Sequence, residues 1–396
     1  MRTTDLYTNK IDCCGCELCS IICPRNIIAM RADEEGFLYP FIQNESLCIN
    51  CRQCLSVCPA KTPGRVPNQI IDSYGGHLLE IESVKKSSSG GYATAISQAF
   101  IKNGGVVYGA RYTNDYYGVT FSRAISLEEL EPFRTSKYCQ AKKGNIYKDV
   151  LKDLLEHRKV LFIGLPCEIS ALYHYVGKCI DNLFTISLVC HGPTSQKVQK
   201  DFVDNIESKL KSKINSFSVR YKQDGWKPYY ILAKSVDGKV CKQKFNVSSY
   251  GTAFLYMKRP SCSICKYKQG NDEFGLQSDI TLGDFHSVRK NMPHYNKWGV
   301  SQLSIQSQKG KFLFEMIKQT CKLEYISPEK INIGNVAFQK ALPMKKGREK
   351  YVKAYLNHSL HYANYLPFII FHRYCILFQK IIKFVFAAIK HIFKYL

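Results

Sequence analysis

Eight cysteines near the start of the chain form two copies of one motif. Each copy reads C-x2-C-x2-C-x3-C-P, beginning at Cys13 and again at Cys48. Two-residue gaps curl a chain tightly enough to bring three thiolates to one iron–sulfur cubane, and the fourth cysteine, before proline, ligates the other cluster. The spacing therefore predicts two [4Fe-4S] clusters, one held by Cys13, Cys16, Cys19 and Cys58 and the other by Cys48, Cys51, Cys54 and Cys23.

Zinc is the competing metal for these cysteine ligands, because C-x2-C is also half of a zinc knuckle. A structural zinc site needs two such pairs, but it does not need a run of four cysteines that ends before Pro24 or Pro59. Cys14 lies outside the ligand spacing, and we interpret it as a free thiol. The repeat favours an electron-transfer protein.

Four later cysteines could form a further redox site. The runs KVLFIGLPC and LFTISLVC each look like a strand ending in a cysteine, at Cys167 and Cys190, with a helix-sized segment between them. A right-handed βαβ crossover would place both strand ends on one edge of the sheet. Cys262 and Cys265 form a C-x2-C pair flanked by basic residues. Together the four thiols could hold a third [4Fe-4S] cluster.

Different roles remain open for these four cysteines. A cysteine that ends a buried strand is often only a small core residue. A redox-active dithiol or a zinc site would also use such a set. The remaining cysteines have no partner at motif spacing and are interpreted as core or surface residues, namely Cys139, Cys179, Cys241, Cys321 and Cys375.

A serine and glycine run, Ser88 to Gly91, directly precedes a helical pattern. Free N–H groups at a helix start can bind the phosphate of a flavin or nucleotide, although such runs more often only cap helices and turns. In SDITLGDF, Asp279 and Asp284 bracket a strand. Asp284 could meet a ribose or a flavin edge, and a turn-capping role is equally consistent with its position.

The elements that position these residues lie between residue 71 and about residue 340, where strand and helix periods alternate. This alternation favours an α/β domain with a mixed, largely parallel sheet. The expected helices are Gly90 to Asn103 and Cys167 to Val176, while Lys330 to Lys353 resists assignment. The expected strands are Val106 to Ala110, Val160 to Cys167, Leu183 to Cys190, Phe217 to Tyr221, Tyr230 to Ser235, Asp279 to Asp284 and Gln302 to Gln306.

Three regions follow from these patterns. Residues 1–68 are expected to form an α+β, ferredoxin-like two-cluster module, which ends in a linker rich in proline and glycine over 60–68. Residues 69–355 are expected to form the α/β domain with the flavin and the further iron–sulfur site. Residues 356–396 are expected to form a basic, amphipathic, helical tail.

The composition suits a redox protein of the cytoplasm. There are 18 Cys in 396 residues, and the first residues show no apolar stretch typical of a secretory signal, so we expect reduced thiols. The formal net charge of +24 overstates the cationic character, because each cluster with four thiolates carries about −2. No helix-turn-helix or interleaved aromatic and basic face is evident, so no nucleic-acid partner is expected.

Taken together, these segments resemble the coenzyme F-420 hydrogenase/dehydrogenase beta subunits, which are iron–sulfur flavoproteins. The resemblance runs from residue 13 to about 305, in the family's order. It is carried by the paired cysteine runs and by SSSGGYATAI, GGVVYGA, RTSKYCQ, LFIGLPCE, LVCHGPTS, RPSCSICKYK and SDITLGDF.

The resemblance implies FAD and a third cluster in the central domain, and electron transfer between a hydride donor and the ferredoxin module. It places Ser89, Gly90, Gly91, Lys137 and Tyr138 near the flavin and makes Cys167, Cys190, Cys262 and Cys265 cluster ligands. Two departures put the use of deazaflavin in doubt. His286 and Ser287 follow GDF where the family commonly has Trp and Gly, and Glu168 replaces the usual Gln. Short members of the family also resemble components of surface-polysaccharide loci, which implies a sugar or a lipid-linked sugar as substrate.

The tail, residues 366–396, never reaches 18 apolar residues without a charge, so a transmembrane span is not expected. On a helical wheel the basic residues share an arc of about 100°, namely Arg373, Lys380, Lys383, Lys390, His391 and Lys394. A basic stripe beside a wide apolar face is typical of a helix lying on an anionic membrane, and the protein would then be peripheral on the inner face of the cell membrane. Packing on the protein's own core or on a partner is the alternative.

Two functional hypotheses follow. The first is an iron–sulfur flavoprotein oxidoreductase that exchanges electrons with a redox partner protein or a small-molecule donor. The second is a non-catalytic electron carrier or adaptor that has kept the fold and lost the flavin. Flavin bands in the absorbance spectrum after cluster extraction would distinguish them.

Overall fold

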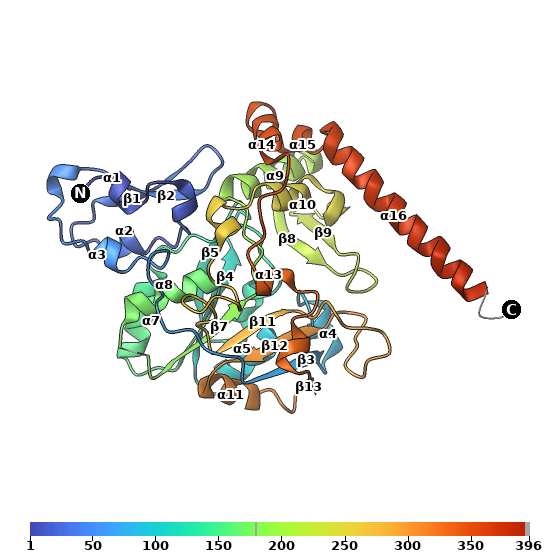
Figure 1. The fold of residues 1–396 in the computed structure, drawn as a ribbon, viewed down its shortest axis with the longest axis horizontal. Helices are drawn as coiled ribbons and strands as arrows, with labels where there is room; N and C mark the ends of the chain where they lie inside the picture. The colour runs from blue at the N-terminus through green and yellow to red at the C-terminus, as the bar shows by residue number, and fades with distance from the viewer. Residues whose placement is uncertain (179, 393–396) are drawn as a thin grey trace.

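A computed structural model describes residues 1–178 and 180–392. The N-terminal module lies at one end of the molecule, and a long C-terminal helix projects from the other side (Figure 1). The module contains the antiparallel pair β1 (Ile28–Ala32) and β2 (Leu38–Ile42) and the short helices α1 (Thr3–Leu6), α2 (Leu18–Ile22) and α3 (Gln53–Ser56). Helices α2 and α3 each carry the third cysteine of a motif, so the repeat in the sequence is also a repeat in structure.

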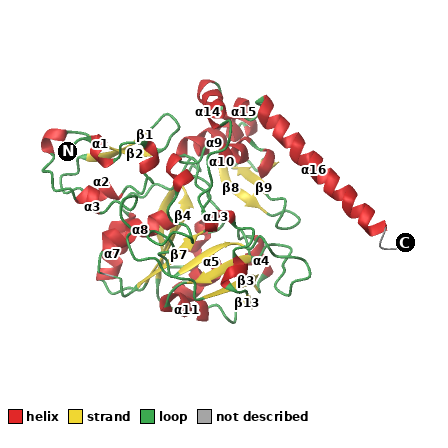
Figure 2. Cartoon of the chain, viewed as in Figure 1, coloured by secondary structure: helices red, strands yellow, loops and turns green. Residues whose placement is uncertain are grey.

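An eight-stranded sheet forms the centre of the molecule (Figure 2). Its order is β13-β3-β12-β11-β7-β6-β4-β5. The strands are β3 (Asp72–Leu78), β4 (Val106–Tyr112), β5 (Val119–Ala124), β6 (Val160–Gly164), β7 (Leu183–Leu188), β11 (Ile280–Asp284), β12 (Ser301–Ile305) and β13 (Cys321–Tyr325).

The sheet is mixed, but the expectation that it is largely parallel was wrong. Only the central strands β11, β7, β6 and β4 run parallel to one another. The outer pairings are antiparallel, because strands such as β4 and β5 are joined directly and need no crossover helix. The expected βαβ unit is present as β6, α8 (Pro166–Val176) and β7.

Strand residues alternate between two hydrophobic cores, as a sheet covered on both faces requires. Val106 and Tyr108 face the larger core, whereas Val107 between them faces the smaller one. Helices α7 (Ile146–Leu155) and α8 cover the first face, and α5 (Tyr92–Lys102) and α11 (Gln308–Glu315) cover the second. The short helices α4 (Ile81–Lys85) and α6 (Leu127–Leu130) lie in the connections that follow β3 and β5.

A second, three-stranded sheet extends the larger core. Its antiparallel strands are β8 (Ile214–Tyr221), β9 (Tyr230–Ser235) and β10 (Val240–Lys244). Helices α9 (Gln196–Leu210), α10 (Ser249–Tyr256), α14 (Arg348–Asn357) and α15 (Leu360–Ala363) pack around it, and the single-turn helices α12 (Pro328–Ile331) and α13 (Val336–Gln339) precede α14 in the chain. The unassigned segment 330–353 thus consists of short helices and turns.

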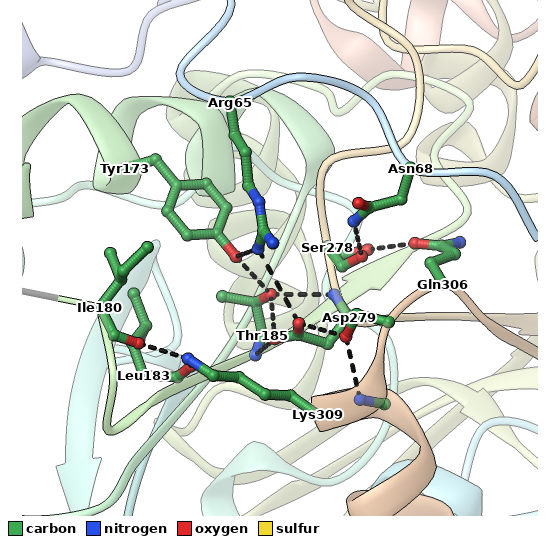
Figure 3. A network of polar contacts seen from close by, with 12 residues as sticks. Arg65, Asn68, Tyr173, Ile180, Leu183, Thr185, Ser278, Asp279, Gln306 and Lys309 are labelled. Atoms are coloured by element: carbon green, nitrogen blue, oxygen red, sulfur yellow. Dashed lines mark hydrogen bonds and ion pairs between the residues drawn. The ribbon is translucent and has the colours of Figure 1, made fainter. Parts of the chain in front are cut away.

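The linker between the module and the central domain is fixed in place. Figure 3 shows Arg65 and Asn68 of the linker reaching a buried polar network around Asp279. Arg65 Nη1 donates to the Tyr173 hydroxyl at 3.3 Å, and Asn68 Nδ2 donates to the carbonyl of Ser278 at 3.1 Å. Asp279 accepts from the backbone N–H of Thr185 at 2.8 Å. Of the two aspartates that bracket the strand, Asp279 therefore joins linker, helix and sheet.

Helix α16 spans Pro367–Ile392. Its start packs on the body, where Ile369 is buried and Arg373 Nη2 donates to the Thr252 hydroxyl at 2.8 Å. Phe371 in the same first turns is 70% exposed. Farther along, the helix projects into solvent, and Phe378 is 63% exposed. The side chains of Lys380, Lys383 and Lys390 and residue Lys394 lie outside the described part. Within the described residues, no helix is both long and apolar enough to cross a bilayer.

Candidate functional site

Cysteines from the two motif copies lie close to one another in the module. Burial raises the pKa of Cys19, and the charges of Cys13, Cys58 and Cys54 raise it further, so these thiols are its neighbours. The pKa of Cys54 is raised mainly by burial and further by the charges of Cys23 and Cys51. Cys48 packs with Cys23 and Cys54 in the core of the module. The fourth cysteine of each copy therefore lies with the other copy, as cross-ligation requires.

The donor set consists of thiols alone, which suits iron–sulfur clusters. Across residues 1–178 and 180–392, no three His, Cys, Asp or Glu side chains are placed to hold a single metal ion.

The first motif copy docks onto the central domain through buried polar contacts. Arg259 is 1% exposed, and its Nε donates to the carbonyl of Cys13 at 2.7 Å while Nη2 donates to the Cys13 sulfur at 3.4 Å. Gln140 Nε2 donates to the carbonyls of Cys14 and Gly15 at 3.1 Å each. Gly15 has φ 70°, and a Cβ there would lie 2.6 Å from Arg259 Nη1, so only glycine permits this approach.

The four later cysteines line one cavity of about 480 Å³ between the module and the central domain. Cys167, Cys190, Cys262 and Cys265 all contribute to its wall, and Cys14 joins them from the first motif copy. Side-chain hydrogen bonds to Cys16 and Cys167 lower the pKa of Cys14. Cys14 is thus not an isolated free thiol, because it lies between a cysteine of the first set and one of this cavity.

Cys167 lies in the first turn of a helix, close to where the helix from Cys167 to Val176 was expected, whereas the expectation that it ends a strand was wrong. Strand β6 ends at Gly164, and Pro166 begins α8 because its fixed φ suits the first turn. A side-chain hydrogen bond with Cys14, together with burial, raises the pKa of Cys167. Cys190 lies two residues beyond the end of β7, so the crossover does bring both thiols to one sheet edge.

Glu168, the departure from the family's glutamine, forms a buried ion pair. Lys143 Nζ lies 2.6 Å from Glu168 Oε1, and the two side chains are 0% and 5% exposed. Glu168 Oε2 also accepts from the backbone N–H of Leu165 at 2.8 Å. Burial is the largest influence on Lys143 and acts to lower its pKa, but the charges of Glu168 and Glu17 outweigh it and leave the pKa raised.

A second cavity, of about 390 Å³, lies beside the first and contains most of the expected flavin residues. Ser89, Gly91, Lys137, Tyr138 and Asp284 all line it. Gly90 does not, because its α-carbon faces the sheet: a Cβ there would lie 2.3 Å from the carbonyl oxygen of Gly76. Gly91, at φ 92°, is the residue before α5 and turns the chain into that helix.

The two cavities share part of their walls. Leu165, Glu168, Cys190 and Pro193 line both. The two cavities therefore adjoin at these four residues.

Basic residues surround the second cavity, but most of their donors are engaged. Lys137 Nζ donates to the carbonyl of Arg134 at 2.7 Å, and burial, followed by Arg111, lowers the pKa of Lys137 to about 7. Lys222 Nζ donates to the carbonyl of Ser89 at 2.7 Å, and burial, followed by Arg220, lowers its pKa to about 7. Ser89 itself donates to the carbonyl of Val300 at 2.8 Å.

Comparisons with known proteins match two parts of the chain. Residues 12–62 match the family model of 4Fe-4S dicluster domains, and residues 157–331 match that of the C-terminal region of the coenzyme F420 hydrogenase/dehydrogenase beta subunit. Residues 157–331 therefore correspond to the C-terminal region of this beta-subunit family, and residues 12–62 to an iron–sulfur dicluster domain.

Individual relatives match over part of the chain. A stretch of 53 residues is 36% identical to ketoisovalerate oxidoreductase subunit VorC of Methanothermobacter marburgensis, covering 13% of this chain and 66% of that protein. A chain in the xenon-derivatised F420-reducing [NiFe] hydrogenase complex from Methanosarcina barkeri has a TM-score of 0.48 and 16% identity, covering 73% of this chain and 93% of that chain.

Sequence reasoning missed several residues that the fold brings to these sites. Arg259 reaches Cys13 from a distant segment, Lys143 pairs with Glu168, and Arg220 lines the second cavity. Cys14 could have been suspected from its place beside a ligand. Cys139 and Cys321 are buried as expected, Cys241 and Cys375 are half-buried, and Cys179 lies outside the described residues.

Proposed function

We propose that this protein is an iron–sulfur flavoprotein oxidoreductase that transfers electrons between the two-cluster module, a third [4Fe-4S] cluster and FAD. The observation that carries the proposal is the pair of adjoining cavities, one walled by cysteines and one by the expected flavin residues, with Cys190 in both walls. When bound, the clusters would supply one-electron transfer and the flavin would couple it to hydride chemistry.

The residues of the chain have separate tasks in this proposal. Cys167, Cys190, Cys262 and Cys265 would hold the third cluster, and Cys14 would lie between it and the first motif copy. Arg259 and Gln140 fix that copy against the cavity, so the order of sites does not depend on a flexible linker. In the second cavity, the start of α5 with Ser89 and Gly91 would face a flavin phosphate.

An absorbance spectrum after anaerobic purification and cluster extraction tests the flavin part. Released FAD close to one per chain supports the enzyme, and its absence favours a non-catalytic carrier. Replacing Gly91 with valine supplies a matched variant, since a side chain at φ 92° beside the cavity should lower flavin content and leave the N-terminal iron in place. Equal flavin in both proteins would assign Gly91 to packing only.

The partner is proposed to be a redox protein or a small-molecule donor that meets the second motif copy. Cys51 is exposed there, and Leu47 and Ile49 beside it are 56% and 53% exposed. A role in surface-polysaccharide biosynthesis, with a sugar or lipid-linked sugar as substrate, is proposed from the resemblance to short family members.

We also propose that α16 holds the protein on the cytoplasmic face of an anionic membrane without crossing it. Exposed apolar side chains along the described part of the helix support this, among them Phe371, Tyr374, Phe378 and Ile381. The sequence adds a stripe of basic residues, which an anionic leaflet attracts by about 1 kcal/mol each. Flotation with anionic vesicles tests it.

A further inference from the structure

Arg220 of β8 has a hydrogen-bonding edge that the protein leaves unused. Its side chain is 6% exposed and lines the second cavity. Nη1 donates to Asp284 Oδ2 at 2.9 Å, and the guanidinium lies 4.7 Å from the centre of the Tyr229 ring. Neither Nε nor Nη2 has a hydrogen-bond partner among the described residues.

The position of these two donors on the guanidinium determines what they can bind. Nε and Nη2 point to the same side of the planar group, and this pair matches the two oxygens of a carboxylate or phosphate. The same edge is filled elsewhere in the chain, where Arg123 donates from Nε and Nη2 to Asp153 at 2.7 and 2.9 Å. At Arg220 no carboxylate of the described residues occupies it.

The charged groups around Arg220 are compatible with a bound anion. Asp284 is the carboxylate paired with Arg220, while Lys222 and His286 are close enough for the charge of Arg220 to lower the pKa of each, after burial. Both Nζ contacts of Lys222 are to carbonyl oxygens. A buried guanidinium with two unpaired N–H groups is unfavourable unless an acceptor reaches it.

We propose that the Nε and Nη2 edge of Arg220 binds an oxyanion in this cavity, a phosphate or carboxylate group, while Asp284 holds the guanidinium in place. The inference uses the proposed function only to name the two sources of that group. It belongs either to the phosphate of the bound flavin or to a substrate that enters beside the flavin.

The experiment compares the wild-type protein with Arg220→Gln and Arg220→Lys. Lysine keeps the charge but cannot offer two parallel donors, and Arg158→Gln on the surface controls for loss of a cation. Flavin affinity is measured by fluorescence with FAD, the proposed cofactor, and with FMN and riboflavin, which differ from each other only by the phosphate. Inorganic phosphate and acetate are then added to the flavin-loaded protein, and its visible spectrum is recorded.

If the oxyanion is the flavin's, both Arg220 variants weaken FMN binding by about tenfold to a hundredfold and leave riboflavin binding unchanged. If it is the substrate's, flavin affinities stay equal, and phosphate or acetate shifts the flavin spectrum of the wild type and of Arg158→Gln only. Variants that match the wild type in every titration overturn the proposal.

Two further measurements cover the remaining outcomes. If the protein binds no flavin, the proposed function fails. The role of Arg220 is then tested by thermal unfolding, whose midpoint phosphate should raise in the wild type but not in Arg220→Lys. If neither variant folds, the wild type alone decides: FMN bound no more tightly than riboflavin, with no response to phosphate or acetate, overturns the assignment.

Discussion

The guanidinium of Arg259 lies against Cys13, with Nη2 donating to the cysteine sulfur at 3.4 Å and Nε donating to its carbonyl oxygen at 2.7 Å. The same group lies 4.2 Å from the centre of the Tyr39 ring, so a buried cation from the central domain faces the first set of thiols. The second motif copy has no counterpart to this arginine among the described hydrogen bonds. The two clusters should therefore differ in reduction potential.

Replacing Arg259 with glutamine should lower the midpoint potential of the first cluster, because a nearby cation and a donor to sulfur favour the more negative, reduced state. A shift on the order of 60 mV corresponds to a tenfold change for one electron. Potentiometric EPR should show the second cluster unchanged. Arg259→Lys, which keeps the charge, should shift the potential less, and equal potentials in all three proteins would refute the coupling.

The buried pair of Lys143 and Glu168 predicts a stability effect. Glu168→Gln leaves the Lys143 cation without its closest carboxylate, and breaking such a buried pair costs about 3–5 kcal/mol of unfolding free energy. Glu17 lies near Lys143, so the loss should fall toward the lower figure. The double variant Lys143→Met with Glu168→Gln should recover much of it in thermal unfolding, and additive losses would show that the pair is not coupled.

Flavin binding should depend on pH through Lys137. Burial, followed by Arg111, lowers the pKa of Lys137 to about 7, so the side chain is cationic below pH 7 and neutral above it. The affinity for FMN should therefore fall as the pH rises from about 6 to about 8, while the affinity for riboflavin stays flat. Lys137→Met should weaken FMN binding at the lower pH and reduce the dependence, and any remainder is assigned to Lys222, whose pKa is also lowered to about 7. An unchanged pH dependence in Lys137→Met would contradict the role of Lys137.

The protein should tolerate deletion of the tail only beyond the first turns of α16. Deleting residues 375–396 keeps Ile369 and the contact of Arg373 with Thr252, so the shortened protein should stay folded and lose binding to anionic vesicles. Deleting residues 366–396 removes those contacts and should lower the thermal-unfolding midpoint. High salt should weaken the attachment of the full chain without abolishing it, because screening acts only on the charges. Equal vesicle binding by the chain lacking 375–396 would contradict the membrane proposal.

Local patterns predicted much of this structure. The paired cysteine runs, the crossover unit from Val160 to Leu188 and the helix after Gly91 are set by spacing and periodicity over a few residues. The antiparallel margins of the sheet were not predicted, since strand direction depends on long-range pairing between strands such as β3 and β13.

The same limit applies to the site. The spacing of the cysteines identifies them as candidate ligands. No local sequence pattern identifies Lys143 as the partner of Glu168 or Arg220 as a cavity residue. Such contacts arise only when distant segments pack, and they are the contacts that set charge and orientation in the cavities.

Quantitative iron and sulfide analysis of anaerobically purified protein shows whether the four cysteines of the cavity between module and domain hold a third cluster. We expect about twelve of each per chain, and about eight in Cys265→Ser or Cys167→Ser. Cys14→Ser should keep about twelve, because the four other thiols suffice. About eight in the wild type and in every variant would contradict the third cluster, and stoichiometric zinc without sulfide would contradict iron–sulfur binding by this chain.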